Sequence, residues 1–283
     1  MSQPLRSAAV RAFMLVLTLC PSLVGAEERY PHYEPTDTIV VLGAVPQEIP
    51  VLTDAMTDAE KKSLWGIPYW EGELHGKPVV VAITGIGKTF TGMTTTLFIK
   101  EFKPRAILMT GTGARVNQDL RTGDVIVATH THEHDYGSLT SEGMTYRPMN
   151  GPIDGNEVKN AFSPSDRMLE KAKQAMATYE RREVEANGST YTNRVDFGVV
   201  VSSDLFGVTE QRLTLLRNRF DADIMEMESA PLGHVSEALG VPYLIVRSGS
   251  NLAQEEPNDD YLRLGPIAAR QAAYFSLHLI RHL

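Results

Sequence analysis

Short uninterrupted runs of apolar residues recur along the chain, and several of them end at a glycine-rich segment. They occupy residues 38–42, 79–83, 106–109, 125–129, 197–202 and 243–247. Runs of this length without polar alternation are typical of strands buried on both faces, as in sheets covered by helices on both sides. Each run is therefore predicted to be a strand in the interior of a sheet.

Amphipathic stretches separate these runs and predict helices at about residues 52–64, 89–101, 166–181 and 264–283. Buried strands that alternate with helices indicate a layered α/β fold. The glycine-rich segments 84–88 and 110–113 are expected to be turns that follow strands. The stretch 130–160, rich in Gly, Pro, Ser and Asn, is expected to be loop-like.

The N-terminus has the order of a secretory signal. Arg6 and Arg11 precede an apolar run at 12–19, and the small residues 24–26 precede Glu27. The run is too short to span a bilayer. We expect cleavage after residue 26 and export to the periplasm or beyond. An N-terminal helix of the fold, or a retained anchor, is the alternative interpretation.

Charge and cysteine content narrow the function further. Lys and Arg number 27 against 35 Asp and Glu among 283 residues, a net charge of -8. Without clustered cations to neutralise phosphates, the chain is not expected to bind nucleic acid. Cys20 lies inside the expected signal and follows Leu19, where a lipoprotein signal would need a small residue. The mature chain, 27–283, is thus expected to be one cysteine-free domain stabilised by its core.

Two local patterns resemble a phosphate-binding loop and a metal site, but neither has the full spacing of such a site. The segment Thr84–Thr89 resembles a phosphate loop, yet the first glycine of that motif would have to stand at Ala82. His130, His132 and His134 alternate and could share a face, but no fourth ligand has a spacing that would fix a metal. Neither a metal nor a cofactor is predicted.

Polar side chains gather at three places next to predicted strands. These segments are Gly43–Glu48, Ile224–Ala230 and Val246–Asn251. In open α/β folds, ligands bind in the crevice where strand ends meet. The three segments are therefore expected to meet in one binding crevice.

From about Thr38 to the C-terminus, the order and spacing of these segments resemble the methylthioadenosine/S-adenosylhomocysteine nucleosidases, within the nucleoside phosphorylase superfamily. Further motifs of that family occur in the same order: Gly85–Lys88, Thr110–Gly113, Gly123–Asp124, His134–Asp135, Ser203–Phe206 and Ala268–Gln271. The resemblance implies a three-layer α/β/α fold with a central twisted mixed sheet. A longer variable loop region is expected at about 137–195.

The resemblance also implies a reaction and partners. A purine nucleoside is the implied substrate, and hydrolysis of its N-glycosidic bond is the implied reaction. A homodimer or larger homo-oligomer is implied, with no membrane contact after signal removal. Because this family completes its 5′ pockets with the neighbouring subunit, the longer loop region bears on both pocket and assembly.

Cleaving an N-glycosidic bond builds positive charge on the ribose and negative charge on the base. By resemblance, Glu48 is the general base that activates water, and an exposed turn glutamate is its alternative. Glu228 would accept hydrogen bonds from the ribose 2′- and 3′-hydroxyls, and Met227 would pack on the sugar. Phe206 would stack on the base, whose edge the neighbouring backbone at Gly207 would read.

One position departs from the family. The nucleosidases have an aspartate that serves N7 of adenine where this chain has Asn251. An amide can donate and accept but is no proton reservoir. The departure predicts a preference for 6-oxopurine nucleosides or weaker activity on adenine nucleosides. Val45 and Tyr261 are expected to face the 5′ substituent, and Thr112 to contact the substrate.

Water is the expected nucleophile, because the arginines that bind phosphate in the phosphorylases are missing. At the corresponding places this chain has residues 45–48, which include no arginine, and Met109. Arg115 lies nearby and remains a candidate phosphate contact. Phosphate-dependent phosphorolysis is therefore one alternative function. Because the superfamily includes exported storage proteins with degraded sites, a non-catalytic exported nucleoside-binding protein is the other. Glu226 is expected to support the site rather than to react.

Overall fold

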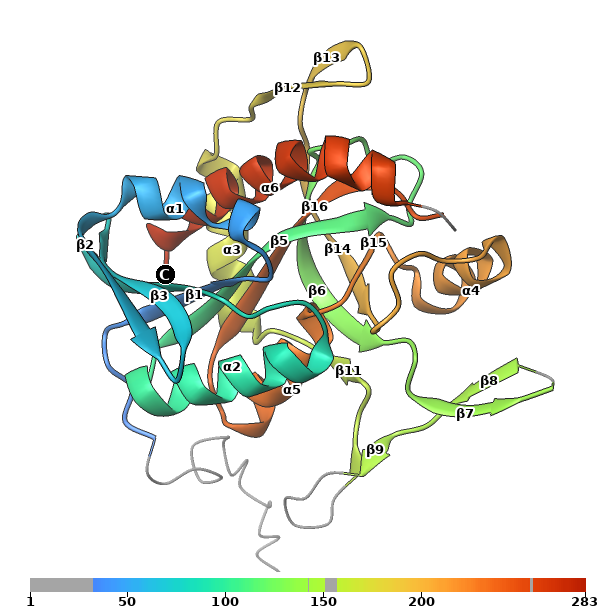
Figure 1. Ribbon diagram of the computed structural model, residues 1–283, viewed down its shortest axis with the longest axis horizontal. Coiled ribbons are helices and arrows are strands. Elements are labelled where there is room, and N and C mark those ends of the chain that lie inside the picture. The colour runs from blue at the N-terminus through green and yellow to red at the C-terminus, as the bar shows by residue number, and fades with distance from the viewer. Residues whose placement is uncertain (1–32, 142, 151–156, 255–256) are drawn as a thin grey trace, which may run out of the picture.

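The computed structural model describes residues 33–141, 143–150, 157–254 and 257–283 (Figure 1). The expected signal, residues 1–26, lies outside the described residues, so its cleavage stays a prediction. No helix in the described ranges is long and apolar enough to cross a membrane. Within the same ranges, no three histidine, cysteine or carboxylate residues gather to hold a metal ion.

A mixed sheet forms the centre of the molecule. Its main order is β11-β6-β14-β15-β5-β1-β4-β3-β2, and β16 pairs with both β5 and β6. The strands are β1 (Ile39–Gly43), β2 (Thr57–Leu64), β3 (Ile67–Leu74), β4 (Lys77–Ile83), β5 (Ala106–Arg115), β6 (Val125–Glu133), β11 (Ala161–Phe162), β14 (Val195–Ser202), β15 (Ile224–Glu226) and β16 (Tyr243–Leu252). The pairs β1–β4, β1–β5, β5–β16, β6–β14 and β14–β15 are parallel.

Helices cover both faces of this sheet (Figure 1). They are α1 (Pro50–Ala55), α2 (Lys88–Phe102), α3 (Asp166–Thr178), α4 (Glu210–Phe220), α5 (Ser229–Ala238) and α6 (Asn258–Ile280). In β1, Ile39 and Val41 pack into a cluster with α1, α3 and α6. Val40 and Leu42 pack instead with α2 and α5. Successive strand residues point to opposite faces, so the apolar runs feed two cores, and the predicted three-layer α/β/α fold is confirmed.

The predicted helix at 52–64 is wrong beyond its first turn. The helix α1 ends at Ala55, and residues 57–64 form β2, which pairs with β3 at the edge of the sheet. The left-handed backbone at Trp65 and Gly66, with φ of 52° and 85°, closes a tight hairpin. The charged residues of β2 suit an exposed edge strand, so tertiary pairing overrides the helix-like pattern.

Three other boundaries also differ from the sequence expectation. The segment 110–113 is not a turn, because β5 continues through it to Arg115. Similarly, β16 continues to Leu252, so Val246–Asn251 lies within a strand rather than at its exit. The expected loop 130–160 begins with the end of β6. Hairpins extend from it: β7 (Gly137–Thr140) with β8 (Gly143–Tyr146), and β9 (Met149–Asn150) with β10 (Glu157–Val158).

Candidate active site

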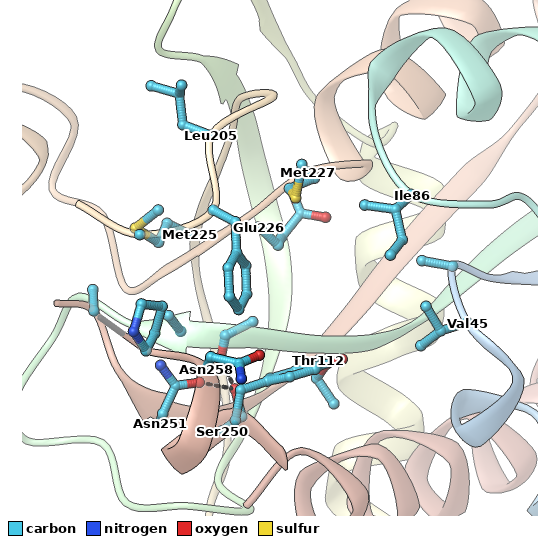
Figure 2. A pocket seen from close by; sticks show the side chains of 18 of the residues that line it. Val45, Ile86, Thr112, Leu205, Met225, Glu226, Met227, Ser250, Asn251 and Asn258 are labelled. Carbon is cyan, nitrogen blue, oxygen red and sulfur yellow. Dashed lines mark hydrogen bonds between the residues drawn. The ribbon is translucent and has the colours of Figure 1, made fainter. Parts of the chain in front are cut away.

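The segments predicted to meet do meet, around a cavity of about 370 Å³. Its walls follow the carboxyl ends of β1, β4, β14 and β15, together with the far parts of β5 and β16. All of the predicted site residues line it: Val45, Glu48, Thr112, Phe206, Gly207, Met227, Glu228, Asn251 and Tyr261. In Figure 2, Val45 and Ile86 lie at one end of the cavity and Ser250 and Asn251 toward the other.

Glu48 lies in the short 3-10 helix η2 (Pro46–Glu48) and is only 2% exposed, so it is not an exposed turn residue. One carboxylate oxygen accepts hydrogen bonds from the backbone N–H groups of Ala44 at 2.6 Å and Val45 at 3.3 Å. The other accepts from the N–H of Thr112 at 2.8 Å and from its hydroxyl at 3.1 Å. Four donors fix the orientation of the carboxylate and complement a negative charge.

The approach of Glu48 to β5 depends on a glycine. A Cβ at Gly111 would lie 2.6 Å from Glu48 Oε1 and 2.3 Å from Arg247 Nη1. Contacts this short do not occur, so any side chain at this position would displace both charged groups. The glycines that suggested a turn in the sequence are therefore required for close packing inside a strand.

Arg247 is the centre of the charged groups, and its side chain is fully buried. Its guanidinium makes an ion pair with Glu226, lies 3.3 Å from Glu228 Oε2 and lies 4.0 Å from Glu48 Oε1. Its Nε donates to the Ser229 hydroxyl at 3.0 Å. Burial opposes its charge, but Glu226 and then the other two carboxylates outweigh burial and raise the pKa of Arg247.

Glu226 is occupied by structural hydrogen bonds. Its carboxylate accepts from the hydroxyls of Ser202 and Ser229 and from the backbone N–H groups of Glu228 and Ser229. A carboxylate that binds the first N–H groups of a helix stabilises the helix start, here that of α5. Glu226 thus fixes Arg247 and the turn that carries Glu228, which suits a supporting residue.

Glu228 is 4% exposed and has fewer partners than Glu226. Its carboxylate accepts from the N–H of Gly87 at 2.9 Å and from Arg247 at 3.3 Å. Burial, followed by the negative charge of Glu226, raises the pKa of Glu228 in spite of Arg247. A ligand that donates hydrogen bonds here would favour the ionised carboxylate.

Aromatic side chains form one wall of the cavity. Phe206 and Tyr261 make an edge contact with ring centroids 5.8 Å apart, and Phe206 remains 57% exposed. The Tyr261 hydroxyl accepts from Gln47 Nε2 at 3.3 Å. Burial, followed by the charge of Glu48, raises the pKa of Tyr261. The exposed flat ring of Phe206 suits a planar base.

Asn251 is 2% exposed and has a defined orientation (Figure 2). Its carbonyl oxygen accepts from the Ser250 hydroxyl at 3.0 Å, and its amide donates to the Leu252 carbonyl at 2.8 Å. The pairing register of β16 with β5 shifts between Gly249 and Leu252, and such a bulge re-aims side chains. One amide hydrogen of Asn251 remains to face a ligand.

Two findings change the residue assignments made from sequence. Arg115, a candidate phosphate contact, donates to the carbonyls of Ser250 at 3.1 Å and Leu120 at 2.7 Å and does not line the cavity. Arg247 was not singled out as a site residue. Its signal was an arginine directly after the apolar run Tyr243–Val246, because a cation inside a buried strand needs partners.

Comparison with known proteins gives consistent results. The chain matches the model of the phosphorylase superfamily over residues 38–281. The 5'-methylthioadenosine/S-adenosylhomocysteine nucleosidase of Actinobacillus succinogenes is 31% identical over 246 residues, covering 87% of this chain and 99% of that protein. The Listeria monocytogenes serotype 4b nucleosidase of the same name is 31% identical over 86% of this chain and 99% of its own.

Solved structures of related hydrolases have a similar fold. The Neisseria meningitidis 5'-methylthioadenosine/S-adenosylhomocysteine nucleosidase, in complex with methylthio-immucillin-A, superposes with a TM-score of 0.75 at 28% identity, over 88% of this chain and all of that one. Futalosine hydrolase of Helicobacter pylori gives 0.74 at 27% identity, over 87% and 98%. Relatives with different named substrates are thus equally similar in structure.

Proposed function

Because the chain belongs to the phosphorylase superfamily, we propose that it is a purine nucleosidase of the methylthioadenosine/S-adenosylhomocysteine type, which hydrolyses an N-glycosidic bond. The observation that carries the proposal is the placement of Glu48 and Glu228 in one cavity. The two carboxylates converge from the segments that follow β1 and β15 and share Arg247 as a common cation.

Glu48 is the general base in this proposal. A water molecule beside its carboxylate attacks C1′ of the ribose and gives a proton to Glu48. The bond from C1′ to the base nitrogen breaks, its electron pair leaves with the base, and the base takes up a proton from solvent. A carboxylate within hydrogen-bond reach of water can act in this way. The N–H groups of Ala44 and Thr112, at 2.6 and 2.8 Å, hold it in place during the reaction.

Glu228 holds the sugar. Two adjacent hydroxyls donating to its carboxylate would favour ionisation, and the resulting charge stabilises the cationic ribosyl transition state. Met227 lies beside it in the cavity wall. The base then extends toward Phe206 and Asn251, and the 5′ substituent extends toward Val45 and Ile86. Val45 and Ile86 lie at the opposite end of the cavity from Asn251 (Figure 2). This apolar end supports a thioether substituent.

The charge of the site favours water over phosphate as the nucleophile. Three carboxylates surround one cation, Arg247, which is fully buried. A phosphate dianion next to Glu48 would be repelled and would lack a cationic partner. Since Arg115 points to backbone carbonyls, it supplies none.

Asn251 bears on the choice of base. Its second amide hydrogen suits O6 of a 6-oxopurine, where adenine carries an amino group that donates, and the amide cannot supply the proton that a departing base takes up. We propose a base preference shifted toward hypoxanthine or guanine nucleosides.

A nucleoside panel tests the function. Inosine, guanosine, adenosine and methylthioadenosine are incubated with the mature protein, with and without phosphate, and base release is measured. We expect phosphate-independent release that falls at least about 10²-fold in Glu48→Gln and Glu228→Gln. Tight nucleoside binding without turnover would instead identify an exported binding protein, and phosphate-dependent release would identify a phosphorylase. A strong preference for adenosine over inosine, which differ only at the base, would refute the oxopurine preference.

Export and self-association complete the proposal. The family match begins at residue 38, which leaves the expected signal outside the matched region. Leu205, Phe206 and Leu262 at the cavity mouth are 54%, 57% and 66% exposed, and an apolar rim of this kind favours a homo-oligomer. Light scattering of the mature protein distinguishes a monomer from a dimer.

A further inference from the structure

Two cavity walls are linked where helix α2 begins. The turn after β4 ends at the N-cap residue Gly87, which has no side chain to accept hydrogen bonds from the first N–H groups of the helix. Two carboxylates from other segments bind the first N–H groups instead. The Lys88 N–H donates to Asp204 Oδ1 at 2.8 Å, and the Gly87 N–H donates to Glu228 at 2.9 Å. Carboxylates are stabilised at this end of a helix.

The backbone of Gly87 is shaped for this contact. Its φ is 95°, a left-handed conformation that favours glycine, and a Cβ there would lie 2.9 Å from Asp204 Oδ1. The two segments therefore approach each other more closely than another residue at this position would allow.

The Lys88 side chain adds a second link. Its ammonium lies 2.7 Å from Oδ1 of Asp135 and 3.1 Å from Oε2 of Glu133. Glu133 is the last residue of β6, and Asp135 follows the strand. The other oxygen of Asp135 accepts from the Asp204 N–H at 3.1 Å. With the lysine side chain 21% exposed and that of Glu133 8%, these pairs are more shielded from solvent than ordinary surface ion pairs.

The loop held in this way carries the base wall. Residues 203–207 follow β14 and include Phe206, whose ring is more than half exposed. Lys88 and Asp204 do not line the cavity, so neither is placed to contact a substrate. Without the Asp204 anchor the loop would sample more conformations, and binding a base would have to order it at an entropic cost.

We propose that Lys88 and Asp204 are positioning residues that set the affinity of the site for the base by holding the Phe206 loop. This inference rests on the proposed function, because it takes Phe206 as the wall against which the base stacks. It separates two tasks: Glu48 and Glu228 serve the bond that breaks, whereas the Asp204 anchor serves binding of the base.

The test compares Asp204→Ala, Asp204→Asn and Lys88→Met with the control Lys62→Met. The control removes an exposed ion pair to Glu71, 2.8 Å long, from the edge strand β2. Calorimetry measures binding of free adenine and hypoxanthine, steady-state kinetics separates KM from kcat, and circular dichroism follows thermal unfolding. Asparagine keeps an oxygen that can accept from the Lys88 N–H.

We expect Asp204→Ala and Lys88→Met to weaken base binding and raise KM by about tenfold, with kcat within about threefold of the starting protein. Asp204→Asn should recover most of the affinity, and Lys62→Met should change neither constant. Unchanged base affinity in Asp204→Ala, a loss confined to kcat, or an asparagine variant as weak as alanine would each overturn the inference. If the unmodified protein binds no purine and releases none, the proposed function itself fails.

Discussion

At the scale of single residues, the site is governed by one buried cation among three carboxylates. Arg247 is fully buried, and Glu48, Glu226 and Glu228 all approach its guanidinium. A buried ion network of this kind is costly to break from one side, because it leaves charges without compensation.

Arg247→Met is expected to lower the free energy of unfolding by about 3–5 kcal/mol, because three carboxylates would remain buried without their cation. The free energy of unfolding of Arg247→Lys should lie between those of the parent protein and Arg247→Met, since an ammonium keeps the charge but loses the planar fork of the guanidinium. Urea unfolding provides the measurement. Arg263→Met, which breaks an exposed pair with Asp260, should cost no more than about 1 kcal/mol. A methionine variant as stable as the parent would show that the network does not stabilise the fold.

The raised pKa of Glu228 predicts proton-linked nucleoside binding. Ribose hydroxyls favour the ionised carboxylate, so affinity should rise with pH until the pKa of the free protein is passed and then level off. Calorimetry in buffers of different ionisation enthalpy should detect proton release below that pKa. A 2′,3′-dideoxynucleoside and the Glu228→Gln variant should both lose the linkage. Affinity that falls as pH is raised would contradict this assignment.

Asn251→Asp should raise kcat/KM for adenine nucleosides by about 10²-fold, the range of a general acid. In the present orientation one carboxyl oxygen would face the Leu252 carbonyl, where Asn251 now donates at 2.8 Å. Two oxygens at that distance favour the protonated acid, which can supply the proton a departing base needs. Competition between inosine and methylthioadenosine checks the change. Equal losses on both substrates would mean that residue 251 does not address the base.

At the scale of secondary-structure elements, β5 and β16 reach the cavity because each strand continues several residues beyond its apolar run. The apolar run Ala106–Met109 continues as a strand to Arg115, and Tyr243–Val246 continues to Leu252. The two strands pair in parallel over this extension, with Thr110 opposite Val246 and Thr112 opposite Ser248. Small and polar residues in these extensions leave room for a ligand.

Gly111→Ala tests this close packing. The added methyl would meet Arg247 and Glu48 at less than 3 Å, so we expect base release to fall at least about tenfold, as for a displaced catalytic group. The control is Gly92→Ala in α2, where a Cβ meets only Val235 Cγ2, at 3.9 Å. Its activity should be unchanged and its stability slightly higher, by up to about 1 kcal/mol. Full activity in Gly111→Ala would rule out this geometry.

At the scale of the whole molecule, the expected signal changes the charge of the working protein. Loss of Arg6 and Arg11 leaves 25 basic residues from 27 against 35 acidic ones, a net charge of -10. Three of these carboxylates, Glu48, Glu226 and Glu228, line the cavity.

Cleavage after Ala26 predicts a mature N-terminus at Glu27. The full chain is expressed in a bacterium with two membranes, and fractions are examined by N-terminal sequencing and mass spectrometry. The periplasmic fraction should contain the shortened chain. Arg6→Glu with Arg11→Glu should keep the protein in the cytoplasm, because the positive segment of a signal is lost. If the chain with Arg6 and Arg11 intact were found uncleaved in the cytoplasmic fraction, export would be contradicted.

By itself, the sequence determined the layered α/β fold, the interior strands and, through the family resemblance, nine residues of the cavity wall. Uninterrupted apolar runs that alternate with amphipathic helices favour strands buried between two helical layers, and family motifs retain their order along the chain. It also placed Glu48, Glu228 and Asn251 next to strands whose ends meet.

Only the tertiary structure decided what those residues contact. The hairpin of β2 and β3 replaced a predicted helix because β2 gains its hydrogen bonds from β3. The periodicity of residues 52–64 does not report that pairing. Arg247 became the centre of the site because carboxylates from two segments far apart along the chain converge on it, Glu48 from one and Glu226 and Glu228 from the other. Local periodicity reports which face of an element is apolar, whereas charge pairing and strand length depend on partners that only the folded chain brings together.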